Sequence, residues 1–158
     1  MTLALDNVRS ALSRTPKVPQ PPRRVEPRPR GWDAYHRRAE LLDRLIDEVA
    51  TGVRAPHLRW EESFAVAFDD LDSVLCQLRW RWHTTLAARL DAAFDNDGGD
   101  DVDVESIVDA VRRDRAALRA ILDAHRDSPI VRGGDADDRR LIADAHAYAE
   151  CASLARRT

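Results

Sequence analysis

The chain is short of lysine, which occurs once, at Lys17, against 24 arginines. Because alanine is also abundant, we attribute the arginine content to a GC-rich coding bias and not to nucleic-acid binding. The chain also lacks any apolar run near the roughly 18 residues that span a membrane, and residues 1–13 carry Asp6 and Arg9 where a signal peptide would be apolar. We therefore expect a cytoplasmic protein with no membrane partner.

Cysteine and the common catalytic motifs are scarce too. Two cysteines, Cys76 and Cys151, make no disulfide framework, and we expect free thiols. Neither a Gly-rich phosphate loop nor a Cys-x-x-Cys pair nor a nucleophilic serine elbow is present. The acidic turn at 95–101 fails as a calcium loop, because Asp100 takes the glycine position and Ser106 the position of the bidentate glutamate. We therefore predict no catalytic residue and no cofactor.

Heptad spacing of apolar residues is the strongest positive signal. The residues of one seam step by four, three, four, three and four positions, which keeps them on one side of a helix: Phe64, Phe68, Leu71, Leu75, Leu78 and Trp82. The seam predicts a single long helix from about residue 56 to 94.

Three further helices are predicted, over residues 32–53, 102–125 and 135–156. Gly52 and Pro56 should close the first, and so short a link would make the first two helices antiparallel neighbours. Arg115 falls on the apolar stripe of the 102–125 helix, either as a buried ion-pair residue or as the mark of a rotated stripe. The predicted fold is all-α, an up-down four-helix bundle over residues 31–158.

An N-terminal arm precedes this bundle. Residues 1–14 predict a short amphipathic helix, which needs a surface to dock on, and residues 15–30 form a proline- and arginine-rich linker that favours polyproline II. Residues 1–38 carry nine basic and three acidic side chains, a net charge of +6, whereas residues 39–158 carry sixteen and twenty-five, a net charge of −9. The arm is thus basic and the body acidic.

The predicted 56–94 helix is longer than its neighbour, so the flank of residues 79–94 should stay open. Trp82 lies on the seam and is predicted to be core, whereas Trp80 lies about 200° around the helix and should point outward. Arg79 and Arg81 flank it, and tryptophan with arginine is typical of interface hot spots.

These features predict a non-enzymatic protein-interaction or assembly module that binds another protein or a second copy of itself. The predicted partner-binding residues lie on the open flank and along the arm: Arg79, Trp80, Arg81, Leu5, Val8, Leu12, Arg23, Arg24, Arg28 and Arg30.

Two alternatives remain open at this point. The basic arm could bind nucleic acid by neutralising phosphates, although the acidic body argues against it. A hemerythrin-like metal bundle is less favoured, because the histidines are not expected to converge and the Glu-x-x-His motif of di-iron bundles is absent. Its only support is three His-x-x-x-Glu pairs: His36/Glu40, His57/Glu61 and His146/Glu150.

Overall fold

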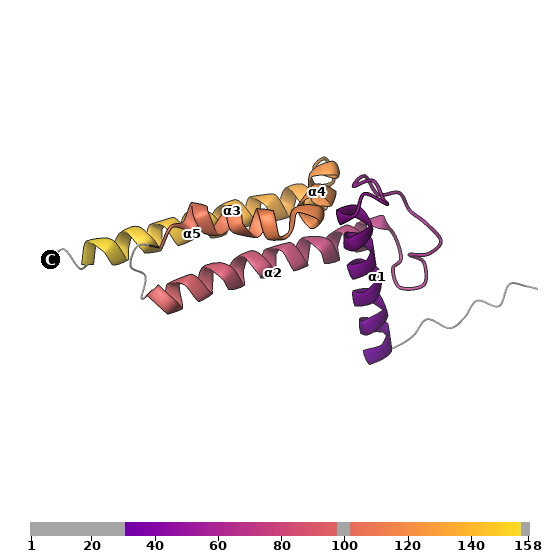
Figure 1. The fold of residues 1–158 in the computed structure, drawn as a ribbon, viewed down its shortest axis with the longest axis horizontal. Coiled ribbons are helices and arrows are strands. Elements are labelled where there is room, and N and C mark those ends of the chain that lie inside the picture. Colours follow the sequence, from indigo (N-terminus) through magenta and orange to yellow (C-terminus); the bar gives the residue numbers. More distant parts are fainter. Residues whose placement is uncertain (1–30, 98–101, 156–158) are drawn as a thin grey trace, which may run out of the picture.

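The computed structural model describes residues 31–97 and 102–155, and these residues form five helices with no strand. The predicted all-α class is confirmed. The predicted arm, residues 1–30, lies outside the described residues. The helices, shown in Figure 1, are α1 (Trp32–Ala50), α2 (Leu71–Asp97), α3 (Val104–Asp114), α4 (Ala116–Ala124) and α5 (Pro129–Ala155).

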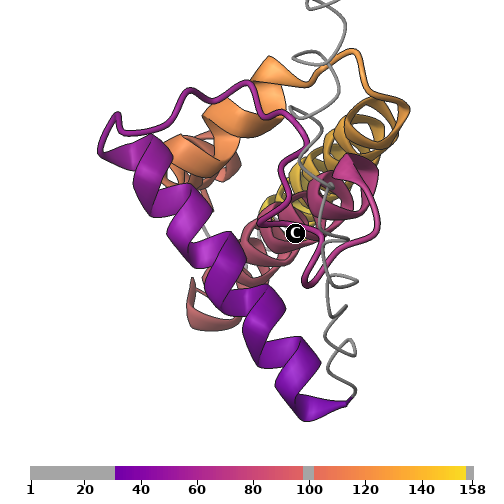
Figure 2. The same cartoon turned by 90° about the vertical axis from the view of Figure 1, so that its right-hand side faces the viewer.

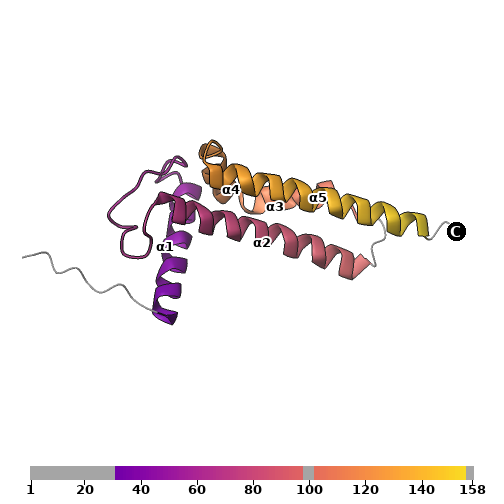
Figure 3. The ribbon, with the colours of Figure 1, turned by 180° about the vertical axis from the view of Figure 1, so that it is seen from behind.

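The arrangement differs from an up-down four-helix bundle. α2, α5 and the α3–α4 pair lie side by side, with α2 and α5 running in one direction and α3–α4 in the other (Figures 1 and 3). α1 lies across one end of this group, where it packs mainly on α4 (Figure 2). The predicted antiparallel pairing of the first two helices is therefore wrong.

α1 is an amphipathic helix whose buried residues are Leu42 and Leu45. It ends at Ala50 because the chain turns at Gly52, where φ is 75°. A side chain at this left-handed φ would be strained, so glycine suits the position. The predicted role of Gly52 in closing the helix is confirmed.

The connection over residues 51–70 corrects the predicted 56–94 helix, which begins only at Leu71. Phe64 and Phe68 are buried as the seam suggested, yet they lie in turns and not in a helix. Asp70 explains the late start, because its carboxylate accepts a hydrogen bond of 2.7 Å from the backbone N–H of Ser73. This bond caps the first turn of α2.

Arg115 divides the predicted 102–125 helix into α3 and α4. Its backbone angles, φ −117° and ψ 32°, are not helical. Its side chain is exposed, so it is not a buried ion-pair residue. α3 buries Val108 and Val111, whereas α4 buries Leu118 and Leu122 next to α1. Arg115 therefore marks a change in direction of the apolar stripe.

α5 begins at Pro129, six residues before the predicted start at Asp135. Proline suits the first helical position because a backbone N–H there would have no acceptor within the helix, so its absence costs nothing. Gly133 and Gly134, which precede the predicted start, lie inside the helix. A Cβ on Gly134 would overlap the Arg79 side chain, so a close contact between α2 and α5 explains this glycine.

Candidate protein-interaction surface

Three consecutive residues of α2 point in three directions. Arg79 is 6% exposed and lies against α5, whereas Trp80 is 60% exposed. Arg81 reaches α1, where it pairs with Asp43. Successive residues of a helix are about 100° apart, so this divergence follows from the helix itself. The expected outward orientation of Trp80 is confirmed, and its role in binding stays a prediction.

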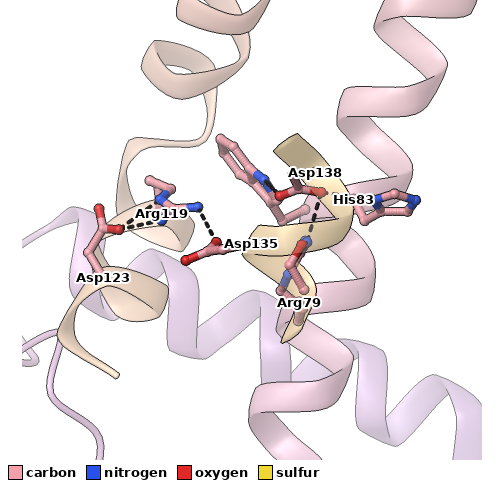
Figure 4. A network of polar contacts seen from close by, with 8 residues as sticks. Arg79, His83, Arg119, Asp123, Asp135 and Asp138 are labelled. Carbon is pink, nitrogen blue, oxygen red and sulfur yellow. Dashed lines mark hydrogen bonds and ion pairs between the residues drawn. The ribbon is translucent and has the colours of Figure 1, made fainter. Parts of the chain in front are cut away.

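Arg79 belongs to a buried polar network, shown in Figure 4. Its Nη2 lies 2.7 Å from Oδ1 of Asp138 and also donates to the Gly134 carbonyl. Asp138 also accepts a hydrogen bond of 2.8 Å from Nε1 of Trp82, and the His83 ring lies 2.8 Å from its Oδ1. Arg79 is therefore unavailable to a partner, which corrects its predicted place on the open flank.

A second guanidinium extends this network to α4. Arg119 pairs with Asp123 at 2.6 Å and with Asp135 at 3.2 Å, and it lies over the Trp82 ring, 5.3 Å from the centroid. Burial acts to lower the pKa of Arg119, but the hydrogen bonds that Arg119 donates to the two carboxylates outweigh it and raise the pKa. The network joins α2, α4 and α5 through side chains that are mostly buried, so we assign it a structural role, although Nε and Nη1 of Arg79 are buried without a hydrogen-bond partner among the described residues.

A groove of about 540 Å³ lies between α1, α2 and α4. Asp43 and the Ala39 carbonyl of α1 hold Arg81 across it, the latter at 3.2 Å. Trp80 contributes to its lining, with the apolar side chains Ile46 and Leu118. The remaining lining residues are polar or charged: Asp47, Thr84, Thr85 and Arg115. The lining thus combines apolar side chains with polar side chains and side chains of both charges.

An aromatic cluster forms at the first turn of α1. Trp32 is 74% exposed and stacks on Tyr35 with 5.9 Å between ring centroids, and His36 lies edge-on to Trp32 at 4.6 Å. The predicted arm joins α1 immediately before this cluster, but its residues are not described. Leu5, Val8, Leu12 and the four linker arginines, Arg23, Arg24, Arg28 and Arg30, therefore stay predictions.

The histidines are dispersed over the fold. His57 stacks on His125 at 4.7 Å, whereas His146 lies 3.2 Å from Glu105 near the far end of α5. Within residues 31–97 and 102–155, no group of three or more histidine, cysteine, aspartate or glutamate side chains is arranged to hold a metal. Both cysteines are exposed free thiols.

Sequence reasoning missed two contacts of this structure. Asp138 precedes Leu141 and Ala145 by three and seven positions, so it lies on the apolar stripe of α5. An aspartate on such a stripe is a signal for a buried ion pair. The bond between Leu58 and His125 left no comparable signal, because these residues are far apart in the chain.

No protein-family model, curated protein or solved structure matches the chain. In the part of the chain that the structure describes, no helix is long and apolar enough to cross a membrane. A functional proposal must therefore come from the surface itself.

Proposed function

We propose that this chain is a non-enzymatic protein-interaction module that binds an amphipathic helix in the groove between α1, α2 and α4. The exposure of Trp80 beside this groove is the observation that carries the proposal. A large aromatic side chain costs little rotamer entropy when it is fixed in an interface, and tryptophan is enriched among residues that dominate binding energy.

The walls of the groove are held in place before a partner arrives. Arg81 is bound to α1 through Asp43 and the Ala39 carbonyl, so this charged part of the lining has less freedom to lose on binding. Ile46 and Leu118 contribute apolar side chains to its lining. An amphipathic helix suits this combination, because its apolar face can cover these residues while its polar face meets the polar and charged lining residues.

The chain carries one such segment, residues 3–14, in which Leu5, Val8 and Leu12 recur at helical spacing. The linker of residues 15–30 would span about 50 Å at about 3.1 Å per residue if it is extended. α1 has 19 residues and is about 28 Å long. The linker is therefore long enough for residues 3–14 to reach the groove of their own chain or of a second copy.

The test compares the full chain with two variants by light scattering and by the NMR signal of the Trp80 indole N–H. One variant carries Leu5→Glu, Val8→Glu and Leu12→Glu, and the other carries Trp80→Ala. If residues 3–14 occupy the groove, the triple variant shifts the Trp80 signal. If the occupant comes from a second copy, both variants also lower the molecular mass.

Tyr148→Ala is the matched control, because Tyr148 is also 60% exposed but lies on α5 beside Phe94. This variant should leave the mass unchanged. An unmoved Trp80 signal together with an unchanged mass in the triple variant contradicts the proposal for this segment.

Binding of nucleic acid by the basic arm makes a different prediction. Affinity for DNA would then fall steeply with salt and disappear when the four linker arginines become alanine. That result, with no effect of Trp80→Ala, would favour the nucleic-acid alternative. A cytoplasmic location stays a prediction from the sequence.

A further inference from the structure

A hydrogen bond joins the connection between α1 and α2 to the end of α4. The backbone N–H of Leu58 donates to Nε2 of His125 over 2.8 Å. His125 is the residue that follows the last turn of α4, and its ring stacks on His57 of the connection at 4.7 Å. Leu58 itself is buried, so its N–H has little access to water as an alternative partner.

This bond requires a neutral His125 ring. Nε2 can accept a hydrogen bond only while it carries a lone pair, which places the proton of the neutral ring on Nδ1. An imidazolium has N–H groups at both nitrogens, so it would face the Leu58 N–H donor to donor. Protonation therefore breaks the bond and leaves the buried N–H without an acceptor.

The surroundings of His125 also disfavour its positive charge. Burial first, and then the neighbouring His57 ring, lower the pKa of His125 below its ordinary value of 6.5. His57 comes from the connection, where Arg54, Arg59 and Glu61 line the hollow beside it. Arg54 is already paired with Glu61 and with Glu48 of α1.

The carboxylate nearest in sequence on α4 is also engaged, because Asp123 binds Arg119. Arg126 and Asp127 follow His125 directly in the chain, with opposite charges.

We propose that the Leu58–His125 contact is a pH-operated latch, which holds the α1–α2 connection on α4 at neutral pH and releases it when His125 is protonated. Release separates residues 54–60 from the end of α4 without requiring the α2–α5 contacts to open. This inference is independent of the proposed binding function, because it concerns a contact on the connection and not the groove.

The sign of the effect follows from proton binding. The latched state binds a proton less readily than the released state, in which His125 recovers an ordinary pKa near 6.5. The equilibrium constant for release therefore rises as the pH falls below 6.5. With one proton involved, it rises by at most about tenfold per pH unit until the pH passes the pKa of the latched state.

The experiment uses the full chain and NMR. The nitrogen shifts of His125 at neutral pH should show Nε2 unprotonated, and its titration midpoint should lie below 6.5. Over the same pH range, hydrogen exchange of the Leu58 amide, corrected for the intrinsic pH dependence of exchange, should lose its protection. A proton on Nε2 at neutral pH, or Leu58 protection that is indifferent to the titration of His125, overturns the proposal.

Two variants separate the latch from general acid sensitivity. His125→Gln keeps an acceptor for Leu58 but cannot be protonated, so its Leu58 protection should not change with pH in this range. His57→Gln removes the neighbouring ring that lowers the pKa of His125, so the transition should move to higher pH. This variant provides a second test should His125→Gln fold poorly. His146→Gln, on the far part of α5, should leave the transition where it is in the wild type. A transition that persists unchanged in the first two variants contradicts the latch.

Discussion

Trp82 of α2 donates a hydrogen bond of 2.8 Å from its indole Nε1 to Oδ2 of Asp138 on α5. Both side chains are almost completely buried, so the bond lies inside the core. The other carboxylate oxygen of Asp138, Oδ1, forms an ion pair with Nη2 of Arg79 at 2.7 Å. One carboxylate therefore holds an aromatic ring and a buried charge of the neighbouring helix in fixed positions.

Removal of this carboxylate should be costly. Asp138→Ala leaves the Arg79 charge buried without its counter-ion, and we expect a loss of about 3–5 kcal/mol in the free energy of unfolding, measured with urea. The exposed Arg89–Asp114 pair is the control, since Asp114→Ala should cost about 0–1 kcal/mol. Equal losses from the two substitutions would show that the buried pair contributes no more than a surface pair.

The two tryptophans of the 80–82 stretch should differ in their effect on stability. Trp82 is 3% exposed, so Trp82→Ala leaves a core cavity and should cost about 3–5 kcal/mol. Trp80→Ala removes a side chain that is exposed while the groove is empty, and in that state the free energy of unfolding should change by less than about 0.5 kcal/mol. Urea unfolding of both variants measures the difference. A large loss for Trp80→Ala would mean that this side chain packs against a part of the chain outside the described residues.

The adjacent glycines of α5 offer a matched pair of substitutions. Nothing lies within 4 Å of a Cβ on Gly133, so Gly133→Ala should stabilise the helix by about 0.5–1 kcal/mol. Gly134→Ala places its Cβ on the Arg79 side chain, and we expect a loss of about 1–3 kcal/mol from overpacking. Thermal unfolding of both variants is the measurement. A gain in both would show that Arg79 moves aside without cost.

The cap of α2 predicts a dependence on pH. Hydrogen bonds from the hydroxyl and the backbone N–H of Ser73 hold the pKa of Asp70 below 3.8, its ordinary value. The charged cap therefore contributes stability above pH 3.8, and this contribution is lost as the pH falls through the lower pKa of the folded state. Asp70→Ala should lower the melting temperature at pH 7 and have less effect at strongly acidic pH.

Asp70→Asn is the control for the cap, because an uncharged amide oxygen can still accept the Ser73 N–H. At pH 7 its melting temperature should lie between those of the wild type and Asp70→Ala, because the amide keeps the hydrogen bond from Ser73 but not the charge. A loss equal to that of Asp70→Ala would mean that charge, and not the hydrogen bond, makes the contribution.

The apolar periodicity of the sequence predicted which residues are buried better than it predicted where helices begin. Trp82 and Leu78 are buried in α2 as expected, and Phe64 and Phe68 are buried without being helical. Turns can bury side chains at helix-like spacing, so the seam alone could not distinguish a helix from a folded connection.

Contacts between distant parts of the chain decided the remaining differences. The path of the connection depends on Leu58 and His125, which are 67 positions apart. The two glycines of α5 suggested a break by their intrinsic propensity, yet Gly134 is required by Arg79 on another helix. For the candidate site, the outward position of Trp80 was predictable from helix geometry. The part of the groove that α1 lines was not predictable, because α1 was expected to run antiparallel to the next helix.

Arg115 occupies a position that continues the heptad of Val104, Val108 and Val111 toward Leu118, yet its side chain is exposed at the break between α3 and α4. The break therefore lies at an exposed arginine and not at a proline or a glycine. With a leucine at position 115, the two stripes would merge into one seam, and α4 would be drawn into line with α3 and away from α1. We therefore expect the angle between α3 and α4 to depend on the charge of this one exposed residue.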